Sequence, residues 1–143
     1  MKIIGIVFSA LAGSLMSIQG VLNTRLNSKT GLWEANVYVQ GIAFLLSLIA
    51  FFVAGKGNLG SFFSAPNIYR IGGILGIMIT VFVIVGMGKL NPAYATAVIL
   101  IAQLLTSGII SAFALLGTEK VPFGMYQYIG TALMLAGVVL FKM

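Results

Sequence analysis

The sequence lacks cysteine and histidine, and only two of its 143 residues are acidic, Glu34 and Glu119. Without cysteine there is no disulfide, no thiolate metal site and no thiol redox chemistry. Without histidine, the commonest general base and metal ligand is missing as well. The sequence contains no apparent nucleophile–base pair or cluster of metal ligands. We therefore expect no enzyme, no metal and no cofactor.

Charge of either sign is scarce, whereas apolar residues make up most of the chain. Only 7% of residues are charged and 60% are hydrophobic, more apolar surface than a soluble domain of this length could bury. Five apolar segments approach the roughly 20 residues that cross a bilayer. They are Ile3–Leu22, Ala35–Ala54, Ile71–Met87, Ala93–Leu116 and Gly124–Phe141. We predict an all-α polytopic membrane protein, with five transmembrane helices in a single domain over residues 1–143.

The connections between these segments are short and rich in turn-forming residues. They are predicted at Asn23–Glu34, Gly55–Arg70, Lys89–Pro92 and Thr118–Pro122. Phe62 and Phe63 in the longest connection are expected to lie in the membrane interface rather than in water.

The eight basic residues divide equally between the two sides of the predicted membrane. One side would carry Lys2, Lys56, Arg70 and Lys120, and the other Arg25, Lys29, Lys89 and Lys142. Orientation normally follows an excess of Lys and Arg in cytoplasmic loops, and four against four gives no excess. We therefore predict insertion in both orientations and an antiparallel homodimer of ten helices. Isolated basic residues at helix ends indicate headgroup anchors, so we expect no nucleic-acid partner.

Polar side chains recur at helical spacing in three of the apolar segments. The stripes contain Gln19, Asn23 and Asn27, then Asn36 and Gln40, and finally Gln103, Ser107 and Ser111. In hydrocarbon these groups need partners, so the stripes should face other helices or a wet cavity. Interhelical hydrogen bonding and substrate binding both remain open. For binding, the candidates are Gln19, Asn23, Asn36, Gln40, Gln103 and Ser107, with Trp33, Tyr38 and Tyr94 as aromatic faces for a cation.

Small residues and the two acids complete the candidate residues. Close helix packing is expected at Gly13, Gly20, Gly72, Gly76, Gly130 and Gly137, because small residues let helices approach within lipid. No acid lies in the middle of a span. Glu34 is the candidate for proton coupling, although a carboxylate is also favourable at a helix N-terminus. Glu119 belongs to a predicted hairpin and is interpreted as structural.

The stretch from Gly13 to Leu26, followed by Gly31, Ala35 and Gly41, resembles the opening of the YdcZ-like family, a branch of the drug/metabolite transporter superfamily. The resemblance continues through the segments that contain Gly72–Gly76, Ala102–Gly117 and Tyr128–Val139. It implies a half-size protein that pairs with an inverted copy of itself or with an oppositely oriented relative. Some members carry an acid late in the fourth span, where this chain has Ser111 and Ala112.

The predicted function is transport across the inner membrane of a small, amphipathic or cationic solute, by alternating access of the inverted dimer. A dual-topology ion channel and a non-transporting partner subunit are the alternatives. The sequence leaves open the solute, the coupling ion, the direction of transport and the choice between a self-partner and a paralogue.

Overall fold

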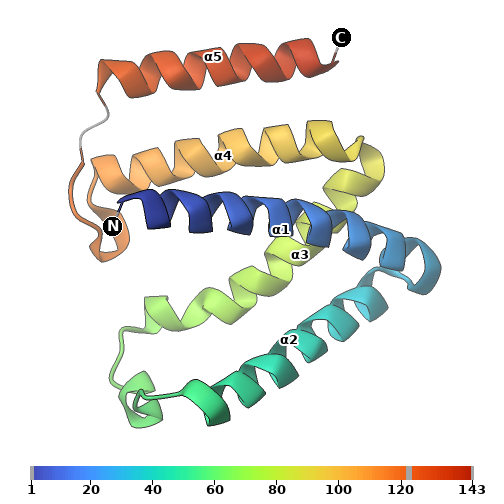
Figure 1. Ribbon diagram of the computed structural model, residues 1–143, viewed down its shortest axis with the longest axis vertical. Helices are drawn as coiled ribbons and strands as arrows, with labels where there is room; N and C mark the ends of the chain where they lie inside the picture. The colour runs from blue at the N-terminus through green and yellow to red at the C-terminus, as the bar shows by residue number, and fades with distance from the viewer. Residues whose placement is uncertain (1, 122–123, 143) are drawn as a thin grey trace. The chain divides into compact units, whose positions relative to one another are not determined.

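The computed structural model describes residues 2–121 and 124–142, and every regular element within them is a helix (Figure 1). The α-helices are α1 (Lys2–Thr30), α2 (Leu32–Ala54), α3 (Gly72–Lys89), α4 (Pro92–Ala112) and α5 (Met125–Lys142). Three short 3-10 helices are η1 (Leu59–Phe62), η2 (Asn67–Ile71) and η3 (Leu115–Gly117). Contacts divide the chain into a first unit, Met1–Lys89, and a second unit, Leu90–Met143, which are described separately. The single domain over residues 1–143 stays a prediction.

Four helices are long and apolar enough to cross a membrane. Within the described residues these segments are Ile3–Thr30, Leu32–Ala54, Asn67–Lys89 and Pro92–Ala112. The fifth apolar helix is shorter, and the 18 residues of α5 extend over roughly 27 Å at 1.5 Å per residue. Large side chains such as Phe8, Phe44 and Phe82 are exposed along the helices, as expected for lipid contact. The prediction of an all-α membrane protein is confirmed, with four long apolar helices and a shorter fifth.

The turn between the first two helices is much tighter than the sequence predicted. The expected connection Asn23–Glu34 is wrong, because α1 continues to Thr30 and only Gly31 lies outside both helices. The hydroxyls of Ser28 and Thr30 donate to carbonyl oxygens three and four residues earlier, at 2.8 and 3.0 Å, so these residues remain helical. Gly31 has φ 101° and ψ 160°, a conformation that is essentially restricted to glycine.

In the first unit, α1 packs closely on α3 at a glycine. A Cβ atom at Gly20 would lie 2.7 Å from the Sδ and Cε atoms of Met87 and 3.0 Å from Cγ1 of Val83. Met87 and Ile84 of α3 are buried, as is Ala35 at the start of α2. The missing side chain of Gly20 therefore lets α1 and α3 approach, and the buried core of the unit lies beside this crossing.

The connection from α2 to α3 is irregular but ordered by local hydrogen bonds. Its first 3-10 helix, η1, is capped by Asn58, whose Oδ1 accepts a hydrogen bond from the Gly60 amide at 2.8 Å. The second, η2, begins after Pro66 and runs directly into α3. The connection therefore holds its side chains in defined positions at the membrane end of two helices.

In the second unit, α4 begins where the sequence indicated and ends earlier. Asn91 caps the helix by accepting a hydrogen bond from the Tyr94 amide at 2.8 Å, and Pro92 occupies the first turn. The predicted end at Leu116 is wrong, because α4 stops at Ala112. Ala114 and Leu116 both adopt positive φ, at 51° and 56°, which breaks the helix.

Beyond α4 the chain folds back on the helix end before it enters α5. The amide of Val121 donates to the carbonyl oxygen of Ser111 at 3.0 Å, and the hydroxyl of Thr118 donates to that of Leu115 at 2.9 Å. The last residue of the predicted hairpin Thr118–Pro122 lies outside the described residues. From Met125 onward, α5 runs antiparallel to α4 and packs beside it (Figure 1).

Candidate functional site

The polar stripes differ in how deeply the structure buries them. Asn23 on α1 is 8% exposed and Asn36 on α2 is 4% exposed, so each amide is more than nine-tenths buried. By contrast, Gln19 lies one turn before Asn23 on the same stripe and is exposed. The two buried amides belong to helices that contact each other within the first unit.

Asn36 is buried without a partner for its acceptor. Its Oδ1 atom is inaccessible and accepts no hydrogen bond from any residue that the structure describes. A buried polar atom left in this state lowers the free energy of unfolding by about 1–3 kcal/mol. The penalty is larger in an apolar environment, where nothing else can supply the hydrogen bond. Asn36 thus leaves an amide oxygen unpaired in the interior of the unit.

Gln40 lies one helical turn beyond Asn36 and reaches α3. Its Nε2 atom donates to the Thr80 hydroxyl at 3.5 Å, and that hydroxyl donates to the Gly76 carbonyl at 3.0 Å. Gly76 leaves room for the amide, since a Cβ atom there would lie 3.8 Å from Nε2 of Gln40. The long hydrogen bond between Gln40 and Thr80 is weak, so both groups can turn toward another partner.

Four buried or half-buried polar residues come from three helices of the first unit. We use the term inner polar residues for Asn23 of α1, Asn36 and Gln40 of α2, and Thr80 of α3. The sequence predicted the first three as binding candidates from their helical spacing. Thr80 was missed, although a hydroxyl four residues after Gly76 in an otherwise apolar helix is the signal that could have identified it.

The other predicted binding residues are exposed or half-buried. Trp33 and Tyr38 of α2 are exposed, and so is Glu34. In the second unit, Gln103 and Ser107 of α4 are exposed and Tyr94 is half-buried. The binding roles of all these residues stay predictions.

Glu34 occupies the first turn of α2 and lies over the glycine turn. A Cβ atom at Gly31 would collide with the carboxylate of Glu34, so the side chain folds back across the start of its own helix. A negative charge there interacts favourably with the exposed amides of the helix N-terminus. The position fits a helix-terminal role, and the alternative of proton coupling stays a prediction.

The predicted packing glycines separate into two groups. Gly20 and Gly76 have side-chain atoms of a neighbouring helix within 4 Å of the position that a Cβ would take. The other four have no such neighbour among the described residues: Gly13, Gly72, Gly130 and Gly137. The backbone at these four positions is uncovered in a single chain, and their packing role stays a prediction.

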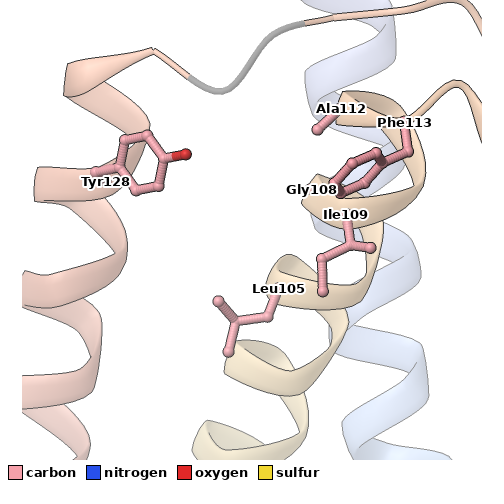
Figure 2. Close-up of a pocket in the computed structure, with 6 residues that line it drawn as sticks. All are labelled: Leu105, Gly108, Ile109, Ala112, Phe113 and Tyr128. Carbon is pink, nitrogen blue, oxygen red and sulfur yellow. The ribbon is translucent and has the colours of Figure 1, made fainter.

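A small apolar hollow lies between the two helices of the second unit (Figure 2). It has a volume of about 170 Å³ and is lined by Leu105, Gly108, Ile109, Ala112 and Phe113 of α4 and by Tyr128 of α5. In Figure 2 the Tyr128 hydroxyl points from α5 toward α4. The volume is below the 300–1,000 Å³ typical of pockets for drug-sized ligands. The hollow can therefore accept an apolar group of a few atoms.

The described residues contain no group of three or more His, Cys, Asp or Glu side chains that could hold a metal ion. The functional groups of the inner polar residues are three side-chain amides and one hydroxyl. These groups bind by hydrogen bonding and carry no charge at any ordinary pH.

Comparison with known proteins identifies one family. A family model described as "Putative inner membrane exporter, YdcZ" matches residues 4–140, nearly the whole chain. The match confirms the resemblance seen in the sequence, and with it an inner-membrane location. No curated protein and no solved structure matches the chain.

Proposed function

Because this chain belongs to the YdcZ family of inner-membrane proteins, we propose that it transports a small, amphipathic or cationic solute as an antiparallel homodimer. The family is described as exporters, which points to transport rather than catalysis. All five α-helices cross the membrane in this proposal, and two inverted copies supply ten.

The observation that carries the proposal is the free acceptor of Asn36. An apolar residue would fill the same buried position without leaving an unpaired oxygen, so the amide is a disadvantage to the resting fold. The disadvantage is removed when a solute donates a hydrogen bond to Oδ1. Gln40 lies one helical turn beyond Asn36, and Gln40 and Thr80, whose mutual hydrogen bond is weak, can exchange partners with the solute.

The equal division of basic residues supports the inverted dimer. Arg25 and Lys29 lie in the last turns of α1 rather than in a loop, but they stay at the same end of the helix. The count of four basic residues on each side is therefore unchanged.

In the dimer, the uncovered glycines and exposed residues such as Gln103 and Tyr38 face the second copy. Inverted copies exchange roles when the assembly rocks, so inward-open and outward-open states are equivalent.

The binding role of Asn36 is tested by replacing it with leucine, which has the same branching at Cγ and no polar atom. A thermal-shift screen of metabolites and quaternary ammonium compounds first identifies a solute, and its uptake is then measured in proteoliposomes. We expect Asn36→Leu to melt at a higher temperature than the parent protein and to lose most of its uptake, since the unpaired oxygen is gone.

The matched control for this test is Gln127→Leu, which removes an exposed amide from α5. We expect a much smaller change in melting temperature, because no buried polar atom is removed. Uptake by Asn36→Leu at the parental rate would contradict the binding role of Asn36.

The inverted arrangement is tested by labelling, and the absence of native cysteine makes the experiment clean. Single cysteines at Ser61, between α2 and α3, and at Asn91, between α3 and α4, are treated in intact cells with a membrane-impermeant maleimide. We expect both sites to be labelled in about half of the molecules. If one site reacts fully and the other not at all, every copy has the same orientation and the proposed mechanism is wrong.

A further inference from the structure

The connection between α2 and α3 presents a surface that transport does not explain. We call residues 55–71 the interfacial loop. Its large apolar side chains are exposed: Leu59, Phe62, Phe63, Ile68 and Tyr69. The loop follows the apolar helix Leu32–Ala54, and its last residues begin the apolar segment Asn67–Lys89; both segments are long enough to span a membrane, so the loop lies at the membrane surface. Apolar side chains at that depth favour the boundary between headgroups and acyl chains.

The charges of the loop are of one sign. Lys56 and Arg70 are its basic residues, and residues 55–71 contain no acid. A basic segment beside a membrane span is attracted to anionic lipid headgroups. Apolar exposure and unopposed positive charge together select a phospholipid with a negative headgroup rather than a protein partner or a neutral lipid.

Arg70 is held in a definite position by an aromatic ring. Its Cζ atom lies 5.7 Å from the centroid of the Phe62 ring, within the range of a cation–π contact. Phe62 is itself braced by an edge-on contact with Phe63, with 5.6 Å between ring centroids. The guanidinium is therefore already positioned before a ligand binds. Its planar arrangement of N–H donors matches the oxygens of a phosphate.

The hydrogen bonds of Arg70 are incomplete within the protein. Its Nε atom is inaccessible and has no hydrogen-bond partner among the described residues. The residue as a whole is only half-buried, so its exposed surface belongs to other atoms. The inaccessible Nε is closed to a ligand, so a phosphate would meet the exposed part of the guanidinium, while the exposed phenyl rings beside it contact the acyl chains.

We propose that the interfacial loop binds the phosphate of one anionic phospholipid through Arg70, with Phe62 holding the guanidinium and Phe63 in contact with the acyl chain. Lys56 adds a second positive charge to the same loop. The proposal does not depend on the transported solute or on the orientation of the second copy.

The test compares lipids on the purified full-length protein in neutral detergent. Native mass spectrometry and melting temperature are measured with dioleoyl phosphatidylglycerol, with dioleoyl phosphatidylcholine, and with inorganic phosphate. We expect phosphatidylglycerol to be retained and to raise the melting temperature more than phosphatidylcholine does. Inorganic phosphate should have no effect, because it lacks acyl chains. An equal effect of free phosphate would overturn the lipid assignment.

Substitutions in the interfacial loop test whether phosphatidylglycerol binds there. Arg70→Gln should weaken phosphatidylglycerol binding roughly fivefold, the contribution of one basic residue near a membrane surface. Phe62→Leu keeps an apolar side chain and removes the ring, and should reduce the preference for phosphatidylglycerol without abolishing it. Lys89→Gln, at the opposite end of α3, is the matched control and should bind like the parent. Unchanged binding by both loop variants, or an equal loss in Lys89→Gln, would refute the proposal.

Discussion

The two units reverse the direction of the chain in different ways, and the difference shows what each turn requires of its sequence. In the first unit a single residue, Gly31, separates two helices, and its φ and ψ of 101° and 160° belong to a region that only glycine adopts readily. In the second unit Ala114 and Leu116 take positive φ with ψ of 39° and 25°, in the left-handed region. Other residues reach that region at a cost of roughly 1–2 kcal/mol. The first turn therefore requires glycine at position 31, whereas Ala114 and Leu116 adopt the conformation of the second turn at a cost in backbone strain.

The largest effect on stability is expected from Gly31→Ala. We expect it to lower the free energy of unfolding by at least about 1–3 kcal/mol, because the backbone becomes strained and the new Cβ meets the carboxylate of Glu34. Gly41→Ala is the control, since Gly41 is helical and has no neighbouring atom within 4 Å of a built Cβ. It should be neutral or stabilising by up to about 1 kcal/mol. Thermal melts in detergent measure both, and equal stability of the two variants would contradict the strain argument.

A smaller change of opposite sign is expected in the second unit. Leu116→Gly should raise the free energy of unfolding by about 0.5–1 kcal/mol, because relief of the left-handed strain exceeds the entropy that glycine adds to the unfolded chain. Leu115→Gly, beside it, is the control and should destabilise the protein, because Leu115 is not among the non-glycine residues with positive φ. If both glycine substitutions lower the free energy of unfolding equally, backbone strain at Leu116 does not reduce the stability of the protein.

The smallest effect is expected from Glu34→Gln, which keeps the shape of the side chain over the Gly31 turn and removes its charge. The free energy of unfolding should fall by less than about 1 kcal/mol, and the effect should shrink at high salt. Uptake into proteoliposomes should respond to an imposed pH gradient in the same way in the variant and in the parent protein. Loss of that response would instead assign Glu34 the coupling role.

Helix positions were predictable from sequence where local chemistry is unambiguous. The start of α4 follows from Asn91 and Pro92, which cap a helix and fix its first turn. The end of α1 was mispredicted because serine and threonine can break a helix or bond back to it, and here they bond back. The end of α4 was also mispredicted, since no local signal announces left-handed backbone at Ala114 and Leu116.

The candidate site was predictable as a set of stripes but not as an arrangement in space. Spacing placed Asn36 and Gln40 on one helix face, and the structure keeps them there. Spacing could not separate Gln19 from Asn23, which share a stripe but differ in burial. That difference depends on where helices cross, and the crossing depends on Gly20 and its neighbours on α3.

The single-residue turn also limits how the first unit can move. One residue between two helices provides two backbone torsions, and at Gly31 they are held in a sparsely populated region. The Gly31 amide donates to the Asn27 carbonyl oxygen at 2.9 Å, and the Gly31 carbonyl oxygen accepts from the Ala35 amide at 3.0 Å, so we expect α1 and α2 to tilt together. Asn36, five residues past Gly31, would then move less than the far ends of both helices.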